Sequence, residues 1–446
     1  MLLTNGKKRI PIGYEDFKQL IDSGFYYVDK SMLIYELLHS GGQNNLITRP
    51  RRFGKTLNFS MLKYFFDINE KDNAYLFDGL KISEYYEELA MYRNTHPVIT
   101  LSLKCAKQGN YREALRGLKY EIQRQFINNK FILDSDKLAD EYKDEYKKIL
   151  SMDEDAVWSN SIQLLSICLK QYYGTKTIIL IDEYDVPLED AYFSGYYDEM
   201  VRFIRSLFES ALKTNSALEF SVITGCLRIS KESIFTGLNN FKIFPITKVA
   251  FDEYFGFTDD EVRDMLHYYE LDSDYETVKN WYDGYSFENG ISIYSPRCVV
   301  NCMRFGKIGN YWNQTETFEA LRIYIEMNFE GLKDDVISMI AGNAVPVNTG
   351  SFANDMSTFH TEDDVLTLLI HLGYVSYDYD NKTVKIPNEE VRTEYVNSIS
   401  ASTWGEVSKA LKESADTLEA IWQKRPKQVA EAIRQAHFET FHIQYN

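Results

Sequence analysis

Short apolar runs bounded by polar residues recur through the first half of the chain and predict β-strands. These runs lie at Asn45–Thr48, Pro97–Leu103, Thr177–Asp182, Glu219–Thr224 and Phe241–Ile246. Between the runs, apolar residues recur at helical spacing and predict helices over residues 29–38, 54–66, 112–128, 135–150, 158–172 and 197–213. Strands that alternate with helices indicate βαβ units, so we expect an α/β fold with a mainly parallel sheet and helices on both faces.

From Phe251 onward the pattern becomes mainly helical. Thr258 followed by three acidic residues is typical of a helix start, and Pro296 precedes a predicted helix over residues 297–304. Trp281–Tyr285 is interpreted as a turn with aromatic packing.

A third pattern begins near residue 361. A helix at Glu362–Leu372 and a hairpin formed by residues 374–379 and 383–386 suggest a winged-helix-like module, which we interpret as an internal scaffold. Trp404 opens an amphipathic helix that Pro426 ends, and a second helix is expected to run to about His437.

The segment Arg-Pro-Arg-Arg-Phe-Gly-Lys-Thr lies between a predicted strand and a predicted helix. Gly54-Lys55-Thr56 matches the second half of a phosphate-binding loop, in which the lysine reaches the β- and γ-phosphates and the hydroxyl binds Mg²⁺. The first glycine of the consensus falls on Arg49, so the loop departs from the pattern at one position. The residues predicted to bind nucleotide are Arg49, Pro50, Arg51, Arg52, Phe53, Gly54, Lys55 and Thr56.

Acidic and polar side chains follow two of the other predicted strands. Asp182 and Glu183 stand at the carboxyl end of a buried strand, the edge at which open α/β sheets bind ligands. P-loop ATPases place a magnesium-associated aspartate and a water-activating glutamate there, so Asp182 is the predicted metal ligand with Thr56, and Glu183 the predicted base. Asp185 is a further candidate for the magnesium shell.

Thr224 ends the next strand. We expect this residue to hold the attacking water or to contact the γ-phosphate. Arg228 and Lys231 follow it, and either could bring positive charge to the transferring phosphoryl group, although an ordinary surface charge is the competing interpretation. Arg228 is retained as a predicted catalytic residue.

These motifs together resemble those of the AAA-ATPase-like proteins of gut and anaerobic bacteria. The matching segments are Gly24–Ser31, Arg49–Thr56, Ile181–Asp185, Thr224–Ser233, Trp281–Tyr285, Tyr294–Pro296 and Ile386–Arg392. The resemblance covers about residues 10 to 446, and in that family the arginine-rich loop is the usual form. It implies a P-loop NTPase sheet, ATP and Mg²⁺ as cofactors, and a C-terminal PD-(D/E)xK nuclease-like domain that this chain is expected to lack.

The resemblance and the pattern together predict four parts. They are an ATPase core over residues 1–250, a helical lid over 251–330, a winged-helix-like module over 331–400, and a helical linker over 401–446. The resemblance leaves room for a homo-oligomer, and nucleic acid would be reached only through the absent C-terminal domain.

Composition limits the function classes. The net charge of −17 argues against tight binding to a nucleic-acid backbone by this chain alone. No apolar run is long enough for a membrane span, and the amino terminus lacks the pattern of a signal peptide. Five cysteines without a Cys-x-x-Cys pair favour a reducing cytoplasm and disfavour a zinc site.

A hidden nuclease centre is not expected. Glu141-Tyr142-Lys143 and Glu145-Tyr146-Lys147 have the required letters, but they lie in a predicted helix instead of on strands. Two hypotheses remain: a Mg²⁺-dependent ATPase switch of the AAA-like or STAND-like type that controls an effector domain, and a non-catalytic nucleotide-binding scaffold. The intact Glu183 favours the first, and the departure at Arg49 slightly favours the second.

Overall fold

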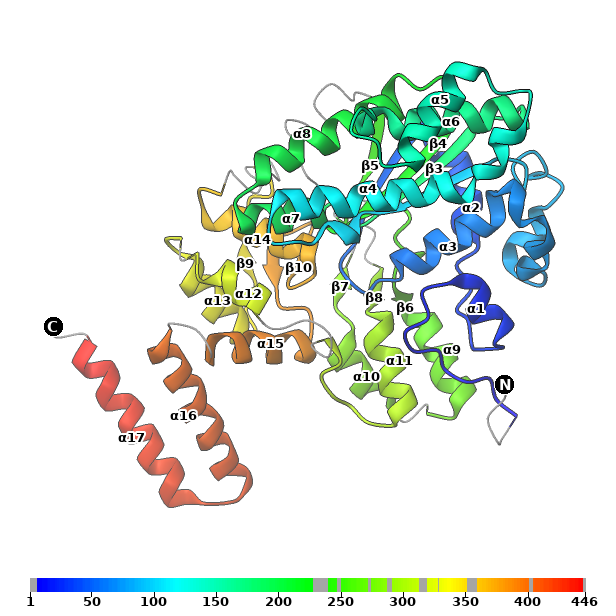
Figure 1. Ribbon diagram of the computed structural model, residues 1–446. Helices are drawn as coiled ribbons and strands as arrows, with labels where there is room; N and C mark the ends of the chain where they lie inside the picture. Colours follow the sequence, from blue (N-terminus) through cyan, green and yellow to red (C-terminus); the bar gives the residue numbers. More distant parts are fainter. Residues whose placement is uncertain are drawn as a thin grey trace.

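The structure is a computed structural model. It describes residues 6–227, 240–246, 250–271, 274–286, 291–312, 319–327, 329–350, 359–400 and 404–443. An α/β part forms one end of the molecule, helices and two small sheets form a second part, and the last two helices project away from both (Figure 1).

A five-stranded parallel sheet forms the centre of the α/β part. Its strand order is β2-β3-β4-β1-β5, and every neighbouring pair is parallel. The strands are β1 (Asn44–Thr48), β2 (Val98–Ser102), β3 (Thr177–Asp182), β4 (Leu218–Gly225) and β5 (Phe241–Phe244). The predicted α/β fold with a parallel sheet is therefore confirmed.

Burial explains why the strands were visible in the sequence. All residues of β1 and β3 are buried, as are all but one of β4, because helices cover both faces of the sheet. A strand covered on both faces reads as a continuous apolar run instead of an alternating one.

The helices of the α/β part are shown in blue to green in Figure 1. They are α1 (Phe17–Asp22), α2 (Met32–Ser40), α3 (Lys55–Phe66), α4 (Tyr111–Asn128), α5 (Asp140–Leu150), α6 (Ser161–Tyr173), α7 (Val186–Ser194) and α8 (Tyr197–Phe208). Short 3₁₀ segments at Ile68–Phe77, Lys81–Tyr85, Leu103–Ala106, Lys130–Asp134 and Trp158–Asn160 connect them.

Three local predictions differ from the structure. The helix expected from Ser135 begins at Asp140, because the Ser135 hydroxyl accepts a hydrogen bond from the Lys137 amide and holds a turn there. Helix α7 was not predicted, since its nine residues present no clear apolar stripe. Trp281 and Tyr282 end helix α10 (Tyr275–Tyr282), and only the two residues after them form the turn.

The second part opens with an antiparallel sheet of order β6-β8-β7. Its strands are β6 (Phe257–Thr258), β7 (Tyr285–Ser286) and β8 (Ser292–Tyr294), and its other helices are α9 (Asp259–Tyr269) and α11 (Pro296–Phe305). Thr258 caps α9 in a capping box with Glu261, as the acidic first turn predicted.

The remaining elements of this part lie around a second small sheet of order β10-β11-β9. They are α12 (Glu319–Ile325), α13 (Leu332–Ile340), β9 (Val345–Pro346), α14 (Glu362–Leu372), β10 (Ser376–Asp378), β11 (Thr383–Lys385) and α15 (Glu389–Ser400). The helix and hairpin predicted near residue 361 are present, while a winged-helix role for them stays a prediction.

Helices α16 (Gly405–Trp422) and α17 (Pro426–Ile443) form a hairpin that leaves the body of the molecule (Figure 1). Trp404 at its base is buried, but Trp422 at its tip is 77% exposed. Helix α17 runs six residues beyond the predicted His437. Over the described residues, no helix is long and apolar enough to cross a bilayer, and all five cysteines are free thiols.

The loop between β1 and α3 packs against the second part of the molecule. Gly373, which ends α14 in the left-handed conformation, lies so close to Pro50 that a Cβ there would stand 2.7 Å from the proline Cβ. The Phe53 ring meets the Tyr285 ring edge-on at 5.0 Å, and the Tyr285 hydroxyl donates to the Gly373 carbonyl at 2.9 Å. Loop position therefore depends on both parts.

Substitution of Gly373 tests this packing. Gly373→Ala should lower the free energy of unfolding by roughly 2–4 kcal/mol, because left-handed strain adds to overpacking against Pro50. Gly174→Ala is the matched control: Gly174 also ends a helix at positive φ, but nothing lies within 4 Å of its added Cβ. Urea unfolding of both variants measures the difference. Equal losses would mean that the Pro50 contact is not tight.

Candidate functional site

The loop between β1 and α3 has the backbone shape of an anion-binding turn. Arg52 and Gly54 both have positive φ, 71° and 80°, and α3 begins directly after them at Lys55. The first amides of this twelve-residue helix have no acceptor within the helix, so they are available to donate to a phosphate. The Lys55 ammonium donates to the carbonyls of Arg49 and Pro50 at 3.0 and 2.8 Å.

One carboxylate joins three of the predicted site residues. Thr56 Oγ1 donates to Asp182 Oδ2 at 2.8 Å, and Thr224 Oγ1 donates to Asp182 Oδ1 at 2.6 Å. Asp182 and Thr224 are both buried. The structure thus brings together side chains from α3, β3 and β4 that lie far apart in the sequence.

Strand order explains this meeting. Strand β4 lies between β1 and β3, and Thr48 of β1 is level with Gly225 of β4. Ile181 is level with Ile223, so Asp182 and Thr224 stand at the same height on adjacent strands. Parallel strands place all their carboxyl ends at one edge, which is where ligands bind in open α/β sheets.

The side chains at this edge fit a magnesium ion. A hydroxyl and a carboxylate are hard oxygen donors, and Mg²⁺ is normally bound by one or two such protein ligands together with phosphates and water. Among the residues that the structure describes, no group of three or more His, Cys, Asp and Glu side chains could hold a metal by itself. Thr56 and Asp182 would therefore hold the ion only in company with a nucleotide.

Glu183 lies beside Asp182 in an uncommon backbone conformation. Its φ is 54°, in the left-handed region, and its amide donates to Asp182 Oδ1 at 2.9 Å. Burial, and next the negative charge of Asp182, raise the pKa of the Glu183 carboxyl, while Lys104 and Lys55 oppose the shift. A carboxylate with a raised pKa that lines a cavity suits proton transfer.

Asp185 differs from its predicted place in the magnesium shell. Its Oδ2 accepts the amides of Cys226 and Leu227, each at 2.8 Å, so this carboxylate holds the turn that follows Thr224. Burial raises the pKa of Asp185, and the two amides act against that rise. A Cβ on Gly225 would stand 2.4 Å from Asp185 Oδ1, which explains the glycine at that position.

Arg49 faces away from the phosphate side of the loop. Its guanidinium is fully buried and donates to the carbonyls of Thr48, Phe244 and Ala250 at 2.8, 2.9 and 2.6 Å. Burial lowers the pKa of this guanidinium to about 10, so it remains charged at neutral pH. Arg49 therefore connects β1 to the β5 edge through these hydrogen bonds, whereas the sequence predicted a contact with nucleotide.

Of the next two arginines, Arg51 pairs with α7 of the α/β part, and Arg52 lies against Trp312 of the second part. Arg51 Nη2 donates to Glu189 Oε2 at 2.7 Å, and the Arg52 guanidinium lies 5.4 Å from the centre of the Trp312 ring. Phe53 is fully buried. Arg228 and Lys231 lie outside the described residues, so their predicted contribution of positive charge stays a prediction.

A cavity of about 800 Å³ opens in front of Glu183 and the loop between β1 and α3. Loop residues 51–56, Glu183 and Asp185 line one end. The other end lies between the amino-terminal leader (residues 11–30) and the second part of the chain. Its mainly apolar walls are formed by Ile12, Tyr26, Val28, Phe257, Met265 and Val300. The volume suits a nucleotide, with a charged end for phosphates and an apolar end for a base.

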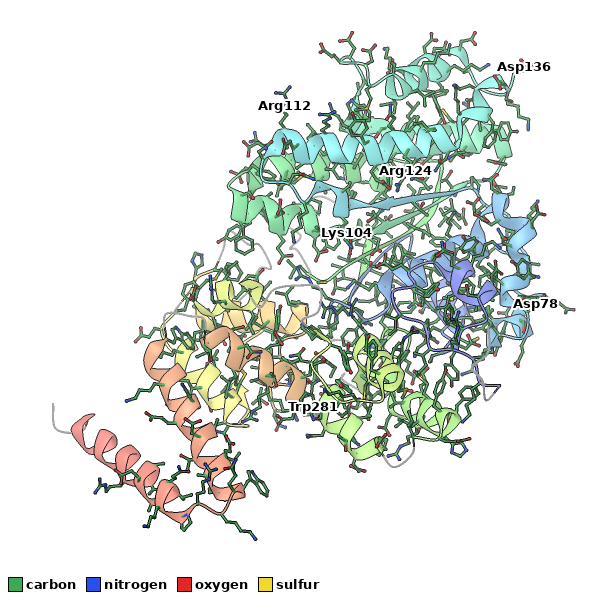
Figure 2. All side chains as sticks on the ribbon, turned by 60° about the horizontal axis from the view of Figure 1, so that its bottom comes forward. Asp78, Lys104, Arg112, Arg124, Asp136 and Trp281 are labelled. Atoms are coloured by element: carbon green, nitrogen blue, oxygen red, sulfur yellow. The ribbon has the colours of Figure 1, made fainter. Side chains whose placement is uncertain are left out.

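Four cations in the cavity wall were missed from the sequence, and one of them, Lys30, is ion-paired with Glu261 at 2.6 Å. Lys104 and Lys107 follow β2, and Arg297 lies in the first turn of α11. The Nε of Arg297 is buried without a hydrogen-bond partner among the described residues. Figure 2 shows Lys104 on the side of the α/β part that faces the second part, whereas Arg112, at the start of α4, points away from the second part. The strand-end rule could have indicated Lys104 but not Arg297.

Comparison with known proteins fits this geometry. A family model described as a predicted AAA-ATPase, of the AAA-ATPase-like family, matches residues 11–235. The chain belongs to that family. The matched region contains the loop, Asp182, Glu183 and Thr224.

A protein of Azotobacter chroococcum mcd 1, named "Uncharacterized protein in vnfD 5'region", is 26% identical to this AAA-ATPase-like chain over 314 residues. The alignment covers 70% of this chain and 55% of the relative, so the chain spans about half of that relative's length.

A pair of substitutions separates loop structure from ligand contact. Arg49→Met should lower the free energy of unfolding by about 3 kcal/mol, because one buried and two half-buried carbonyls lose their donor. Lys55→Met should instead lower affinity for Mg-ATP with a smaller effect on unfolding. Urea unfolding and titration calorimetry measure the two quantities. An Arg49→Met protein that folds as stably as the parent and only binds ATP more weakly would reverse the assignment.

Proposed function

We propose that the chain binds Mg-ATP in this cavity and hydrolyses it slowly, as a switch. The observation that carries this proposal is the joint hydrogen bonding of Thr56 and Thr224 to Asp182, directly beside the helix start of the loop. Membership of a family described as predicted ATPases supports it.

In the proposed complex the phosphates lie on the α3 amino terminus. Amides at the helix start donate to phosphate oxygens, and Lys55 turns from the loop carbonyls to the β- and γ-phosphates. Thr56 and Asp182 would hold Mg²⁺, which when bound neutralises phosphate charge. The apolar end of the cavity, between the leader and Phe257, would enclose the base.

Glu183 is the proposed base and Thr224 the proposed water-positioning residue. Glu183 takes the proton from the attacking water, and Thr224 orients that water from the neighbouring strand end. Lys104 lines the same end of the cavity and attracts the charge of Glu183. It can also compensate the charge that develops on the transferring phosphoryl group.

The proposed switch acts on the second part of the molecule. We infer that α9–α12, within residues 251–330, form a lid over the nucleotide, that α13–α15 form a winged-helix-like scaffold, and that α16 and α17 link to an effector domain. The contacts of Pro50 and Phe53 with Gly373 and Tyr285 support a mechanical connection. A cytoplasmic location and a homo-oligomeric state remain expectations of the sequence.

Thermal stabilisation by nucleotide tests binding. A ligand that binds only the folded state adds about 2.7 kcal/mol at one hundred times its Kd. For a domain of this size Tm should therefore rise by roughly 5–10 °C with Mg-ATP. Lys55→Met should remove most of the rise, and Asp182→Ala chiefly its magnesium-dependent part. An unchanged Tm together with no heat of binding would refute the nucleotide proposal.

Substitution of the base tests hydrolysis. Glu183→Gln should retain Mg-ATP binding and lose at least about 100-fold in kcat, the usual contribution of a general base. The kcat of the parent should fall at acid pH with a midpoint above 4.5, because the raised pKa protonates Glu183 earlier. Phosphate release between pH 4 and 8 measures both. Binding without turnover in the parent would support the scaffold hypothesis instead.

The same variant makes a prediction about stability. A carboxyl whose pKa is raised by folding destabilises the folded state above that pKa, and the penalty disappears as pH falls below the unfolded value. Glu183→Gln should therefore be more stable than the parent at pH 7 and equally stable near pH 4. A loss of stability at pH 7 would contradict the raised pKa assigned to this side chain.

A further inference from the structure

One carboxylate, that of Glu189, is shared between the phosphate-binding loop and the second part of the molecule. Its Oε2 accepts from Arg51 Nη2 at 2.7 Å, and its Oε1 accepts from the Tyr324 hydroxyl at 2.9 Å. Arg51 belongs to the loop, Glu189 to α7 and Tyr324 to α12. The two oxygens of one side chain thus connect elements that are far apart in the sequence.

All three side chains line the cavity that contains Lys55 and Glu183. Tyr324 is 1% exposed, so its hydroxyl is satisfied by Glu189 in the absence of bulk water. Both members of the Arg51–Glu189 pair are mostly buried as well, with side-chain exposures of 23% and 15%. An ion pair at this burial is screened less than a surface pair, so its breakage has a measurable effect.

A bound triphosphate introduces a stronger partner for Arg51. Arginine presents a planar set of donors that matches phosphate as well as carboxylate, and a terminal phosphate carries more charge than Glu189. Arg51 lies four residues before Lys55 in the same loop, so its guanidinium can turn from one anion to the other without a change of fold.

We propose that Glu189 is a positioning residue that competes with the terminal phosphate for Arg51 and passes the outcome to α12 through Tyr324. This proposal rests on the proposed binding of Mg-ATP. When phosphate takes Arg51, Glu189 loses the ion pair that orients its carboxylate, and this weakens its hydrogen bond to Tyr324, which ties α12 to α7 of the α/β part.

The contacts of α12 indicate which other helices a weaker attachment of α12 would affect. Helix α12 packs on α13 and α15, and α15 packs on α16, the first helix of the projecting hairpin. Arg52 provides a second connection to these helices. It lies over Trp312, whose amide donates to Glu390 of α15 at 2.9 Å. The two adjacent loop arginines are therefore both connected, through other side chains, to α12 and α15, and α15 packs on the first helix of the projecting hairpin.

A double-mutant cycle tests the competition, with calorimetric binding of a non-hydrolysable Mg-ATP analogue as the readout. Glu189→Gln should bind the analogue about 5–10-fold more tightly, because phosphate no longer has to displace a carboxylate from Arg51. In an Arg51→Gln background the same substitution should change affinity less than twofold. Glu209→Gln, which removes an exposed charge from the π-helical turn Glu209–Lys213 directly after α8, controls for net charge.

The outcomes of the cycle are distinct. Equal gains from Glu189→Gln in both backgrounds would mean simple charge repulsion, and would overturn the proposal. A loss of affinity in Glu189→Gln would overturn it as well, since Glu189 would then orient Arg51 toward phosphate. If the parent does not bind the analogue, the proposed function itself fails.

Hydrogen exchange of α12 tests the second step. In the parent, the analogue should accelerate amide exchange over residues 319–325 on the order of tenfold, the effect of losing one charge-assisted hydrogen bond. Tyr324→Phe should exchange fast without nucleotide and respond less than twofold to it. Tyr192→Phe, on α7 beside Glu189, is the matched control and should respond like the parent. If the parent binds the analogue fully and its α12 exchange is unchanged, the transmission from Glu189 to α12 is overturned, whereas the competition for Arg51 is not.

Discussion

Asp182 accepts hydrogen bonds from two threonine hydroxyls, and the site depends on this interaction. One hydroxyl comes from α3, the helix after β1, and the other from the end of β4, so one helix and two strands meet at the carboxylate of Asp182. Asp182 can do this because β4 lies between β1 and β3 in the parallel sheet. Strand order thus determines the chemistry that the edge can support.

The sequence predicted the sheet well because its strands are buried on both faces. Runs such as Thr177–Asp182 can be recognised from apolarity alone, and the strand-end rule then pointed to Asp182, Glu183 and Thr224. Where the side chains of Asp185 and Arg49 point could not be predicted. A carboxylate near a strand end can face a metal or a backbone amide, and only the turn after β4 decides between them.

The same limit explains the cations that were missed. Arg297 reaches the cavity because a separate small sheet places the start of α11 opposite the loop, and no local pattern encodes that approach. Helix α7 was missed for a related reason. It is short, and the elements packed against it, not a regular apolar stripe, determine which of its residues are buried. Glu189 on that helix could therefore not be placed beside Arg51 in advance.

The inward orientation of Arg49 has a consequence for how such proteins are recognised. In the usual loop a glycine at this position lets the backbone approach the phosphates, whereas here the side chain joins β1 to the β5 edge and the Ala250 carbonyl. A pattern search that requires glycine at the first position discards this chain for a residue whose side chain does not face the ligand. A search built on the spacing from Gly54-Lys55-Thr56 to a buried strand ending in Asp-Glu would retain it.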